Sequence, residues 1–310
     1  GPNKIASQLE GSKIFTKNLC KKYNIPTAKF GIFTNKNDAN HFVEESKYPI
    51  VIKADGLASG KGVYICETQN EAKNAVGEIF EGKFGTAKNL LIEEFLDGEE
   101  MSYFVISDGK TLKQFQTAQD HKRVFEGDKG KNTGGMGAYC PSRLESNDLD
   151  NKILDKIINP TLRGLRDLDI TFKGFLYAGL MINDNEPYLI EYNVRMGDPE
   201  CQTILPKIKT DLGEIIEACV TENLKSIEID WYDEKSICVV LCSKGYPDEY
   251  NNLVEIKDLS KIKFKKKQFL YHAGTKKINS KIYSNGGRVL NFVTMSKNLK
   301  IARNETIKLL

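Results

Sequence analysis

The stretch that decides the fold is residues 49–63, which reads PIVIKADGLASGKGV. The β-branched run from Ile50 to Lys53 predicts a strand, and a second strand begins at Val63. Three glycines lie between the two strands, with a lysine on either side. Glycine lets the backbone approach an anion closely, so that bare N–H groups can hold phosphate oxygens. The segment is therefore interpreted as a phosphate-binding loop. The alternative is a flexible hairpin loop that binds nothing.

Two common phosphate-binding patterns do not fit this segment. The Walker A order fails because Gly60-Lys61 is followed by Gly62 rather than by Ser or Thr. The Rossmann fingerprint fails because a strand, and not a helix, follows the glycines. The candidate phosphate-binding residues here are Lys53, Gly56, Ser59, Gly60, Lys61 and Gly62.

A second polar pattern lies in residues 188–195, which read YLIEYNVR. Side chains alternate along a strand, so Glu191, Asn193 and Arg195 are expected on one face. Carboxylate and amide oxygens suit Mg²⁺, and an arginine can hold an anion with two hydrogen bonds. The alternative is the solvated face of an amphipathic strand.

A third pattern, residues 92–100, reads IEEFLDGEE. Acidic residues gather around Phe95-Leu96 directly after an apolar strand. Backbone groups there could pair with an adenine ring, and a carboxylate could hold ribose hydroxyls. A charged hairpin end is the preferred interpretation unless another feature indicates ATP.

Residues 117–143 are polar and glycine-rich, with little periodicity, and are predicted to form a long loop. Such loops inside compact domains are usually functional. The loop contains DHKR at 120–123 and NTGGMG at 132–137. His121 is a conceivable general base, although a satisfied loop histidine is the preferred interpretation. Three scattered histidines and no paired cysteines argue against a structural zinc site.

Composition limits the class of protein. The 310 residues predict two domains or three, at about 150 residues each. A hydrophobic fraction of 40% and a charged fraction of 28% are typical of a soluble globular chain. The net charge of +3 argues against nucleic-acid or membrane partners, and no apolar stretch is long enough to span a bilayer. No signal peptide is recognised, and seven cysteines without a CxxC pair predict a reducing, cytoplasmic location.

Helical and strand patterns are mixed without regular alternation, which predicts an α+β fold with largely antiparallel sheets. Expected elements include a strand pair, 174–182 with 188–192, and a last helix that precedes the end of the chain. Further helices are expected at 4–23, 36–46 (with Asn35 as its cap), 69–80 and 151–168. The lysines between 250 and 267 are interpreted as a solvated loop or edge strand rather than an anion site.

Taken together, a phosphate loop, an adenine-binding candidate and a metal-binding strand indicate an ATP-dependent enzyme. The motifs GPNKIASQLEGSK, PIVIKADGLASGKGV, LLIEEFLDGEE, AQDHKRVFEGDKGKNTGGMGAY and LIEYNVRMGDPE closely resemble those of the phosphoribosylamine–glycine ligase family. That family belongs to the ATP-grasp superfamily. The resemblance runs over nearly the whole chain and includes YHAGT and SNGGRVLNFV near its end.

The resemblance implies an ATP-grasp fold, in which two α+β lobes clamp ATP, followed by a β-rich C-terminal domain. It implies a core lobe of residues 1–19 and 93–227, a swinging lobe of 20–92 and a C-terminal domain of 228–310, which is expected to be truncated at its end. The Rossmann-like N-terminal domain of the family is expected to be absent, since the chain starts where that domain would end. Gly1-Pro2 resembles either a cleavage scar or the family's own sequence.

The resemblance also implies roles for residues of the nucleotide site, with ATP and Mg²⁺ or Mn²⁺ as cofactors. Lys13 and Lys53 would contact phosphates, and the loop from Gly56 to Gly62 would close over them. Glu191 and Asn193 would bind the metal, and residues 178–179 replace a third acidic ligand that many ATP-grasp enzymes carry. The implied adenine and ribose contacts are Glu93, Glu94, Phe95, Leu96 and Glu100, with the Glu94 carbonyl and the Leu96 N–H facing adenine.

The implied reaction joins glycine to 5-phosphoribosylamine at the expense of ATP, with Lys53, Arg195 and Asp120 as catalytic candidates and a monomer expected. An ATP-binding fragment without ligase activity is the alternative. A ligase for formate or bicarbonate is disfavoured by the DHKR and NTGGMGAY motifs. The implied substrate-binding residues are Asp120, His121, Lys122, Arg123, Asn132, Thr133, Gly134, Gly135, Met136 and Gly137.

Overall fold

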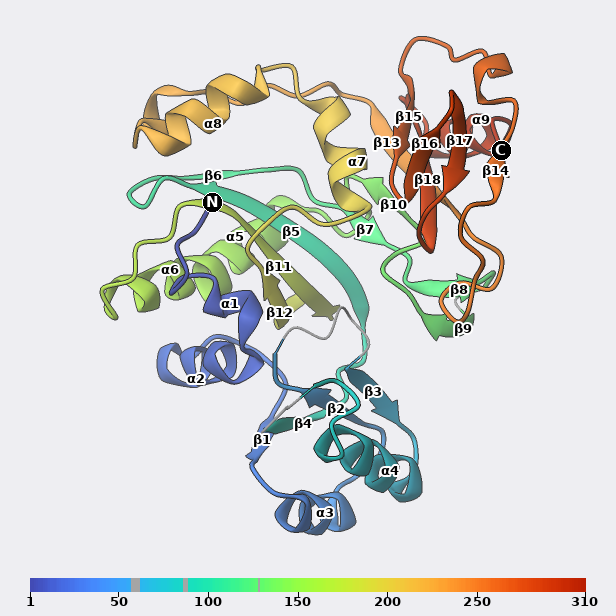
Figure 1. Ribbon diagram of the computed structural model, residues 1–310. Helices are drawn as coiled ribbons and strands as arrows, with labels where there is room; N and C mark the ends of the chain where they lie inside the picture. Colours follow the sequence, from blue (N-terminus) through green and yellow to red (C-terminus); the bar gives the residue numbers. More distant parts are fainter. Residues whose placement is uncertain (57–61, 86–88, 128) are drawn as a thin grey trace. The chain divides into compact units, whose positions relative to one another are not determined.

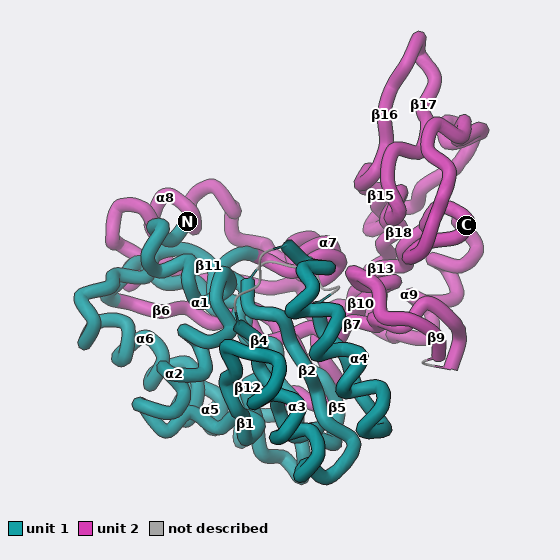
Figure 2. The backbone as a smooth tube through the Cα atoms, turned by 60° about the horizontal axis from the view of Figure 1, so that its bottom comes forward, with its two compact units in different colours: residues 1–100, 105–110, 146–195 teal, residues 101–104, 111–145, 196–310 magenta. Residues whose placement is uncertain are grey.

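A computed structural model describes residues 1–56, 62–85, 89–127 and 129–310 (Figure 1). It mixes helices with antiparallel strand pairs, which confirms the predicted α+β class. Two compact units are distinguished in Figure 2: unit 1 comprises residues 1–100, 105–110 and 146–195, and unit 2 comprises 101–104, 111–145 and 196–310. The three domain boundaries drawn from the resemblance stay a prediction.

Unit 1 contains two groups of strands with helices between them. Its helices are α1 (Gln8–Gly11), α2 (Lys13–Tyr23), α3 (Lys36–Glu45), α4 (Gln69–Phe80), α5 (Asn147–Ile153), a π-helical turn (Leu154–Ile158) and α6 (Asn159–Arg166). Its strands are β1 (Phe30–Phe33), β2 (Ile50–Ala54), β3 (Val63–Cys66), β4 (Leu90–Glu94), β11 (Gly174–Asn183) and β12 (Glu186–Asn193), and β5 (Glu99–Ser107) has residues in both units.

One group is a four-stranded sheet of order β1-β4-β2-β3, and α3 and α4 cover one of its faces (Figure 1). The side chains of Asn35 and Thr68 accept hydrogen bonds from the first turns of α3 and α4, as N-caps do. Apolar residues of both helices, including Val43 and Val76, pack with the buried faces of β2 and β4. Strands β2 and β3 pair antiparallel, with Lys53 opposite Val63, so the glycine-rich segment connects the two strands of a hairpin as predicted.

Strands β11 and β12 form the predicted antiparallel hairpin, and Gly179 lies opposite Glu191. The helix expected at 151–168 starts earlier, at α5, where the Ser146 side chain caps it. It contains the π-helical turn directly before Pro160. Proline has no N–H to donate, so it interrupts the regular ladder there. The helix expected at 4–23 is divided at Ser12 into α1 and α2.

Unit 2 is richer in strands. Its strands are β6 (Leu112–Gln114), β7 (Gln119–Asp120), β8 (Arg123–Phe125), β9 (Lys129–Asn132), β10 (Gly137–Cys140), β13 (Lys235–Cys242), β14 (Glu255–Ile256), β15 (Gln268–His272), β16 (Thr275–Ile278), β17 (Lys281–Ser284) and β18 (Arg288–Ser296). Its helices are α7 (Glu200–Ile204), α8 (Leu212–Val220), α9 (Leu299–Ile307) and 3₁₀ turns at Leu205–Lys207, Leu224–Ser226 and Leu259–Lys261.

The main sheet of unit 2 has the order β15-β18-β13-β10-β7. Helix α9 packs on β13 and β18 and is capped by the Asn298 side chain, which accepts a hydrogen bond from the N–H of Ile301 (Figure 1). A three-stranded sheet, β14-β17-β16, and the β8–β9 hairpin are further parts of the unit. Within the described residues, no helix is both long and apolar enough to cross a membrane.

The prediction of a loop without regular structure over 117–143 is wrong. This segment contains β7, β8, β9 and β10. Strand β10 pairs with β13, about a hundred residues later in the chain, so its partner could not be recognised from local periodicity. The short strands β8 and β9 are half-buried or exposed and carry no alternating apolar pattern.

Candidate nucleotide and substrate sites

The start of α2 positions the first part of the site in unit 1. Ser12 caps this helix by accepting a hydrogen bond from the N–H of Phe15, and its hydroxyl also lies 3.3 Å from Oδ1 of Asp55. The same carboxylate accepts from the N–H of Ile14, since a helix N-terminus favours an anion. Lys13 follows and donates from Nζ to the carbonyl of Gly56 at 2.9 Å. The GSK motif thus holds the first residues of the glycine-rich segment.

Lys53 lies near the end of β2 with its ammonium 2.8 Å from Oε2 of Glu93 on β4. The other oxygen of this carboxylate lies 3.2 Å from the ammonium of Lys17 on α2. The three side chains are nearly buried, with exposed fractions of 7% for Lys53, 4% for Glu93 and 3% for Lys17. Glu93 was predicted at the adenine hinge; the structure shows its carboxylate between two lysines.

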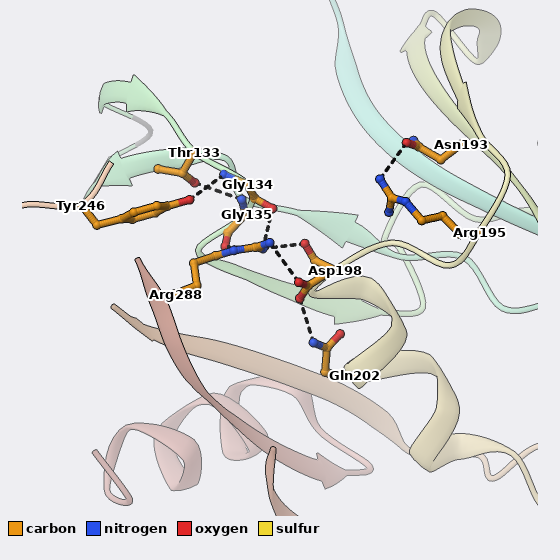
Figure 3. A network of polar contacts seen from close by, with 9 residues as sticks. All are labelled: Thr133, Gly134, Gly135, Asn193, Arg195, Asp198, Gln202, Tyr246 and Arg288. Carbon is orange, nitrogen blue, oxygen red and sulfur yellow. Dashed lines mark hydrogen bonds and ion pairs between the residues drawn. The ribbon is translucent and has the colours of Figure 1, made fainter. Parts of the chain in front are cut away.

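Strand β12 ends at Asn193, so Arg195 lies beyond it, contrary to the prediction of one shared strand face. Arg195 nevertheless turns back, and its Nη2 donates to Oδ1 of Asn193 at 3.2 Å (Figure 3). Glu10 on α1 explains the turn, because its carboxylate accepts from the N–H of Val194 and from Nε of Arg195. The Arg195 guanidinium is ion-paired and still more than half exposed.

Several charged groups act on the Lys13 ammonium. Burial lowers the pKa of Lys13 below its usual value, and Glu191 opposes this shift. Lys53 lowers the same pKa through charge repulsion, and Asp55 and Glu93 raise it. Lys13 therefore lies within electrostatic reach of the β2 lysine and of the carboxylate on β12, both of which are in unit 1.

Glu191 and Asn193 fit a hard divalent cation as two of its ligands. Both side chains are half-buried, and each presents a carboxylate or amide oxygen. Among the described residues no group of three His, Cys, Asp or Glu side chains could hold a metal ion, so substrate oxygens and water would have to complete the shell. A Cβ added at Gly179 would lie 3.5 Å from Cγ of Glu191, which is ordinary contact. The Cβ of a larger residue is thus tolerated beside Glu191.

The predicted adenine contacts follow the end of β4. Glu94 exchanges two hydrogen bonds with Lys29: its N–H donates to the Lys29 carbonyl, and its carboxylate accepts from the Lys29 N–H at 2.9 Å. Phe95 is exposed and Leu96 half-buried, while Glu100 lies on β5. Gly56 has a φ of 102°, and the carbonyl of Gly62 accepts from the N–H of Ala54. The predicted contacts Ser59, Gly60 and Lys61 lie outside the described residues.

In unit 2 the structure brings the two predicted substrate motifs together. Asp120 on β7 lies opposite Ala138 on β10. His121 exchanges backbone hydrogen bonds with the motif's end, donating to the Gly137 carbonyl and accepting from the N–H of Met136. The ring of His121 also stacks on Tyr139 at 6.0 Å between centroids.

The remaining motif residues meet at the β8–β9 hairpin. Arg123 pairs with Asn132, and its Nη1 donates to the carbonyl of Gly130 at 2.8 Å. The Lys122 carbonyl accepts hydrogen bonds from the N–H and the hydroxyl of Thr133. The segments 120–123 and 132–137 therefore form one contiguous surface of strands and turns rather than an irregular loop.

Arg288, at the start of β18, holds the Gly134–Gly135 segment (Figure 3). Its Nη1 donates to the carbonyls of Gly134 and Asp198 at 2.6 Å each, and Nη2 lies 2.9 Å from the Asp198 carboxylate. Tyr246 accepts from the N–H of Gly134 at 3.0 Å. Gly135 has a φ of 110°, and an added Cβ would lie 2.5 Å from Cδ of Pro199, so only glycine fits there.

Several of these residues were not singled out from the sequence. Asp198 and Arg288 stand inside quoted motifs, NVRMGDPE and SNGGRVLNFV, and that context was the available signal. Glu10 likewise lies inside the motif GPNKIASQLEGSK. Lys17 carries no such signal, because a single charged residue in a helix is most often solvated.

Comparison with known families gives two matches. Residues 11–201 match the family described as phosphoribosylglycinamide synthetase, ATP-grasp (A) domain, and residues 236–310 match the C domain of the same synthetase. A phosphoribosylamine–glycine ligase of Brucella melitensis is 46% identical over 94% of this chain and 68% of its own length. One from Agrobacterium fabrum is also 46% identical, over 98% of this chain and 71% of its own.

Solved structures agree with these matches. The phosphoribosylamine–glycine ligase of Thermotoga maritima superposes with a TM-score of 0.86 at 33% identity, covering 100% of this chain and 77% of that one. An N5-carboxyaminoimidazole synthase from Aspergillus clavatus, in complex with ADP, superposes with a TM-score of 0.70 at 14% identity, over 99% of this chain and 74% of that one. The second likeness shows the ATP-grasp fold alone.

Proposed function

The chain belongs to the phosphoribosylglycinamide synthetase family, and from this premise we infer that it is a carbon–nitrogen ligase of purine biosynthesis. It joins glycine to 5-phosphoribosylamine, with ATP converted to ADP and phosphate. The glycine carboxylate attacks the γ-phosphorus and the bond to ADP breaks. The amine then attacks the carbonyl carbon of the resulting glycyl phosphate, a C–N bond forms, and phosphate leaves.

The observation that carries this proposal is the position of two lysines at the glycine-rich segment of unit 1: Lys13 donates to the carbonyl of Gly56 at 2.9 Å, and Lys53 lies near the end of β2, where this segment begins. Phosphoryl transfer needs little covalent chemistry from the protein and depends on positioning and on charge neutralisation. In our proposal Lys13 and Lys53 attract the phosphates, and Arg195, which Glu10 orients, adds a third cation just beyond the end of β12. The residues from Glu93 to Leu96, with Glu100, would receive the adenosine.

A divalent cation, when bound, would neutralise phosphate charge. Glu191 and Asn193 are proposed to hold it, with Mg²⁺ and Mn²⁺ both compatible with their oxygen donors. Asn193 already accepts a hydrogen bond from Arg195, so one lone pair of its oxygen remains for another partner.

Glycine and 5-phosphoribosylamine are proposed to bind along the segments 120–123 and 132–137 in unit 2. The carboxylate of Asp120 would form an ion pair with the ammonium group of glycine. The network of Arg288 and Asp198 would keep Gly134 and Gly135 in place beside the substrates. A reducing, cytoplasmic location agrees with the free state of all seven cysteines, each of which is among the described residues.

The decisive experiment supplies ATP, Mg²⁺, glycine and freshly prepared phosphoribosylamine and detects glycinamide ribonucleotide by mass spectrometry. Formate or bicarbonate in place of glycine should give no ADP release. ADP release with either of them, and none with glycine, would refute the assignment of the acceptor.

The second candidate is nucleotide binding without ligase activity. The observation behind it is that the chain spans 68% to 71% of the length of the first relatives described above. It predicts ADP binding to the purified chain but no glycinamide ribonucleotide. Measuring ADP binding together with the formation of glycinamide ribonucleotide therefore separates the two functions.

A further inference from the structure

Lys17 is a buried cation that the proposed mechanism does not use. Its side chain is 3% exposed, on helix α2. Burial lowers its pKa, and the neighbouring Glu93 opposes this shift. Its Nζ donates to the hydroxyl of Thr27 at 2.5 Å and lies 5.5 Å from the centre of the Phe30 ring. Burying a charged side chain costs free energy unless the charge is paired, so the buried position of Lys17 needs a physical explanation.

The partners of Lys17 connect the two halves of the nucleotide site of unit 1. On one side, Glu93 joins Lys17 to Lys53. On the other side, the Thr27 hydroxyl donates to the carbonyl of Leu189 at 2.6 Å. Leu189 is on β12, the strand that also carries Glu191. One chain of contacts thus runs from the phosphate-binding lysine to the strand of the metal candidates.

The charges of Lys17, Lys53 and Glu93 do not cancel among themselves. Two ammonium groups share one carboxylate, and each of its oxygens faces a different lysine. Without Lys17, the carboxylate of Glu93 would pair with Lys53 alone, and this pair would be neutral. An anionic ligand near Lys53 would then not be attracted by any net positive charge of the Lys53–Glu93 pair. Because interactions are little screened in a buried site, one unit of charge matters there.

We propose that Lys17 is a positioning residue for nucleotide binding, which shares the carboxylate of Glu93 and so leaves Lys53 available to the phosphates. A lysine ammonium has three donors, so Lys53 can keep its contact with Glu93 and still donate to a phosphate oxygen. The proposal deepens the proposed function and rests on it, since it presupposes that Lys53 faces the nucleotide.

The test measures ADP binding by calorimetry, with Mg²⁺ and without glycine. Lys17→Met keeps the length of the side chain and removes its charge, and we expect the dissociation constant to rise about ten-fold. Lys21→Met is the matched control, because Lys21 lies on the same helix with its side chain exposed, and its affinity should equal that of the wild type. Lys17→Arg restores the charge and should stay within about three-fold of the wild type.

A folded Lys17→Met protein that binds ADP like the wild type refutes the proposal, as does a Lys17→Arg protein as weak as Lys17→Met. If Lys17→Met does not fold, Thr27→Val takes its place in the test, since valine cannot accept the hydrogen bond from Lys17. Thr27→Val should weaken ADP binding about three-fold. Unchanged ADP binding in this variant refutes the proposal. Failure of the wild type to bind ADP would instead refute the proposed function.

In the active enzyme, the KM for ATP should rise in Lys17→Met while the KM for glycine stays within two-fold. An equal rise of both would indicate general damage to the structure and would contradict a positioning role.

Discussion

Gly179 stands opposite Glu191 in the β11–β12 hairpin, within the region 178–179 that the family resemblance implies replaces a third acidic ligand. Its backbone is not in the left-handed region, and an added Cβ would make only ordinary contacts with Glu191. A side chain is therefore sterically tolerated at this position.

We predict that Gly179→Asp binds Mn²⁺ about ten-fold more tightly than the wild type in the absence of nucleotide, a gain of ~1.4 kcal/mol. The added carboxylate supplies a further hard oxygen beside Glu191. Titration followed by electron paramagnetic resonance measures the free Mn²⁺.

Gly179→Asn is the matched control, since it adds the same volume without the charge, and it should gain less affinity. Without metal, Gly179→Asp should unfold at a lower temperature, because two carboxylates then face each other. Equal Mn²⁺ affinity in the wild type and Gly179→Asp would argue against a metal at Glu191.

Asp120 lies half-buried on β7, beside the segment proposed to bind the substrates. Asp120→Asn removes its negative charge and keeps its shape, so it should raise the KM for glycine about ten-fold and leave the KM for ATP unchanged. Steady-state kinetics with each substrate varied separately checks this. An unchanged KM for glycine would remove Asp120 from the proposed role.

Helix α3 shows how a local signal defines an element. The sequence predicts its start from Asn35, and the structure has the Asn35 side chain accepting from the N–H of Asp38 at 2.9 Å. Because the first N–H groups of a helix lack partners within it, such a cap stabilises the whole helix.

We predict that Asn35→Ala lowers the free energy of unfolding by about 1 kcal/mol. Urea denaturation followed by circular dichroism measures it. Asn37→Ala, an exposed position inside the same helix, should be neutral or slightly stabilising because alanine has the higher helix propensity. A larger loss in Asn37→Ala than in Asn35→Ala would contradict the capping argument.

The segment 117–143 is the opposite case at the scale of the element. Strand β10 exists because β13 lies beside it, and the polar sequence of 129–132 becomes β9 because β8 offers it a partner. Strand formation depends on a neighbouring strand, which can be remote in the sequence, whereas a helix forms its hydrogen bonds within itself. The prediction therefore succeeded for α3 and α4 and failed here.

For the molecule as a whole, buried thiols make stability depend on pH. Burial raises the pKa of Cys140 from 9.0 to about 12 in the folded protein. The unfolded thiol ionises near its usual value, so the stabilisation by the neutral thiol is complete below pH 9. It is lost as the pH rises from 9 towards 12.

We predict that the stability of the wild type relative to Cys140→Ala falls by about 1.4 kcal/mol for each pH unit above 9. Urea denaturation of both proteins at pH 8, 9, 10 and 11 measures the difference. Cys242→Ala is the control, because Cys242 is only half-buried, and its difference from the wild type should change less. A constant difference across this range for Cys140→Ala would contradict the raised pKa.

The sequence by itself determined the α+β class, the glycine-rich hairpin between β2 and β3, the β11–β12 hairpin and the capped helices. These depend on residues that are neighbours in the chain, and local periodicity, turn residues and caps record them. The motifs, which include Asp198 and Arg288, also indicated the family. They did not indicate what those two residues contact.

Only the tertiary structure decided which charges meet. Arg288 reaches the Gly134 carbonyl across 154 positions of the chain, and Lys17 and Lys53 converge on one carboxylate from α2 and β2. In the sequence each is one lysine or arginine among 45, and most of those are solvated. A buried charge must find a partner because leaving it unpaired costs several kcal/mol, and packing determines which partner is near.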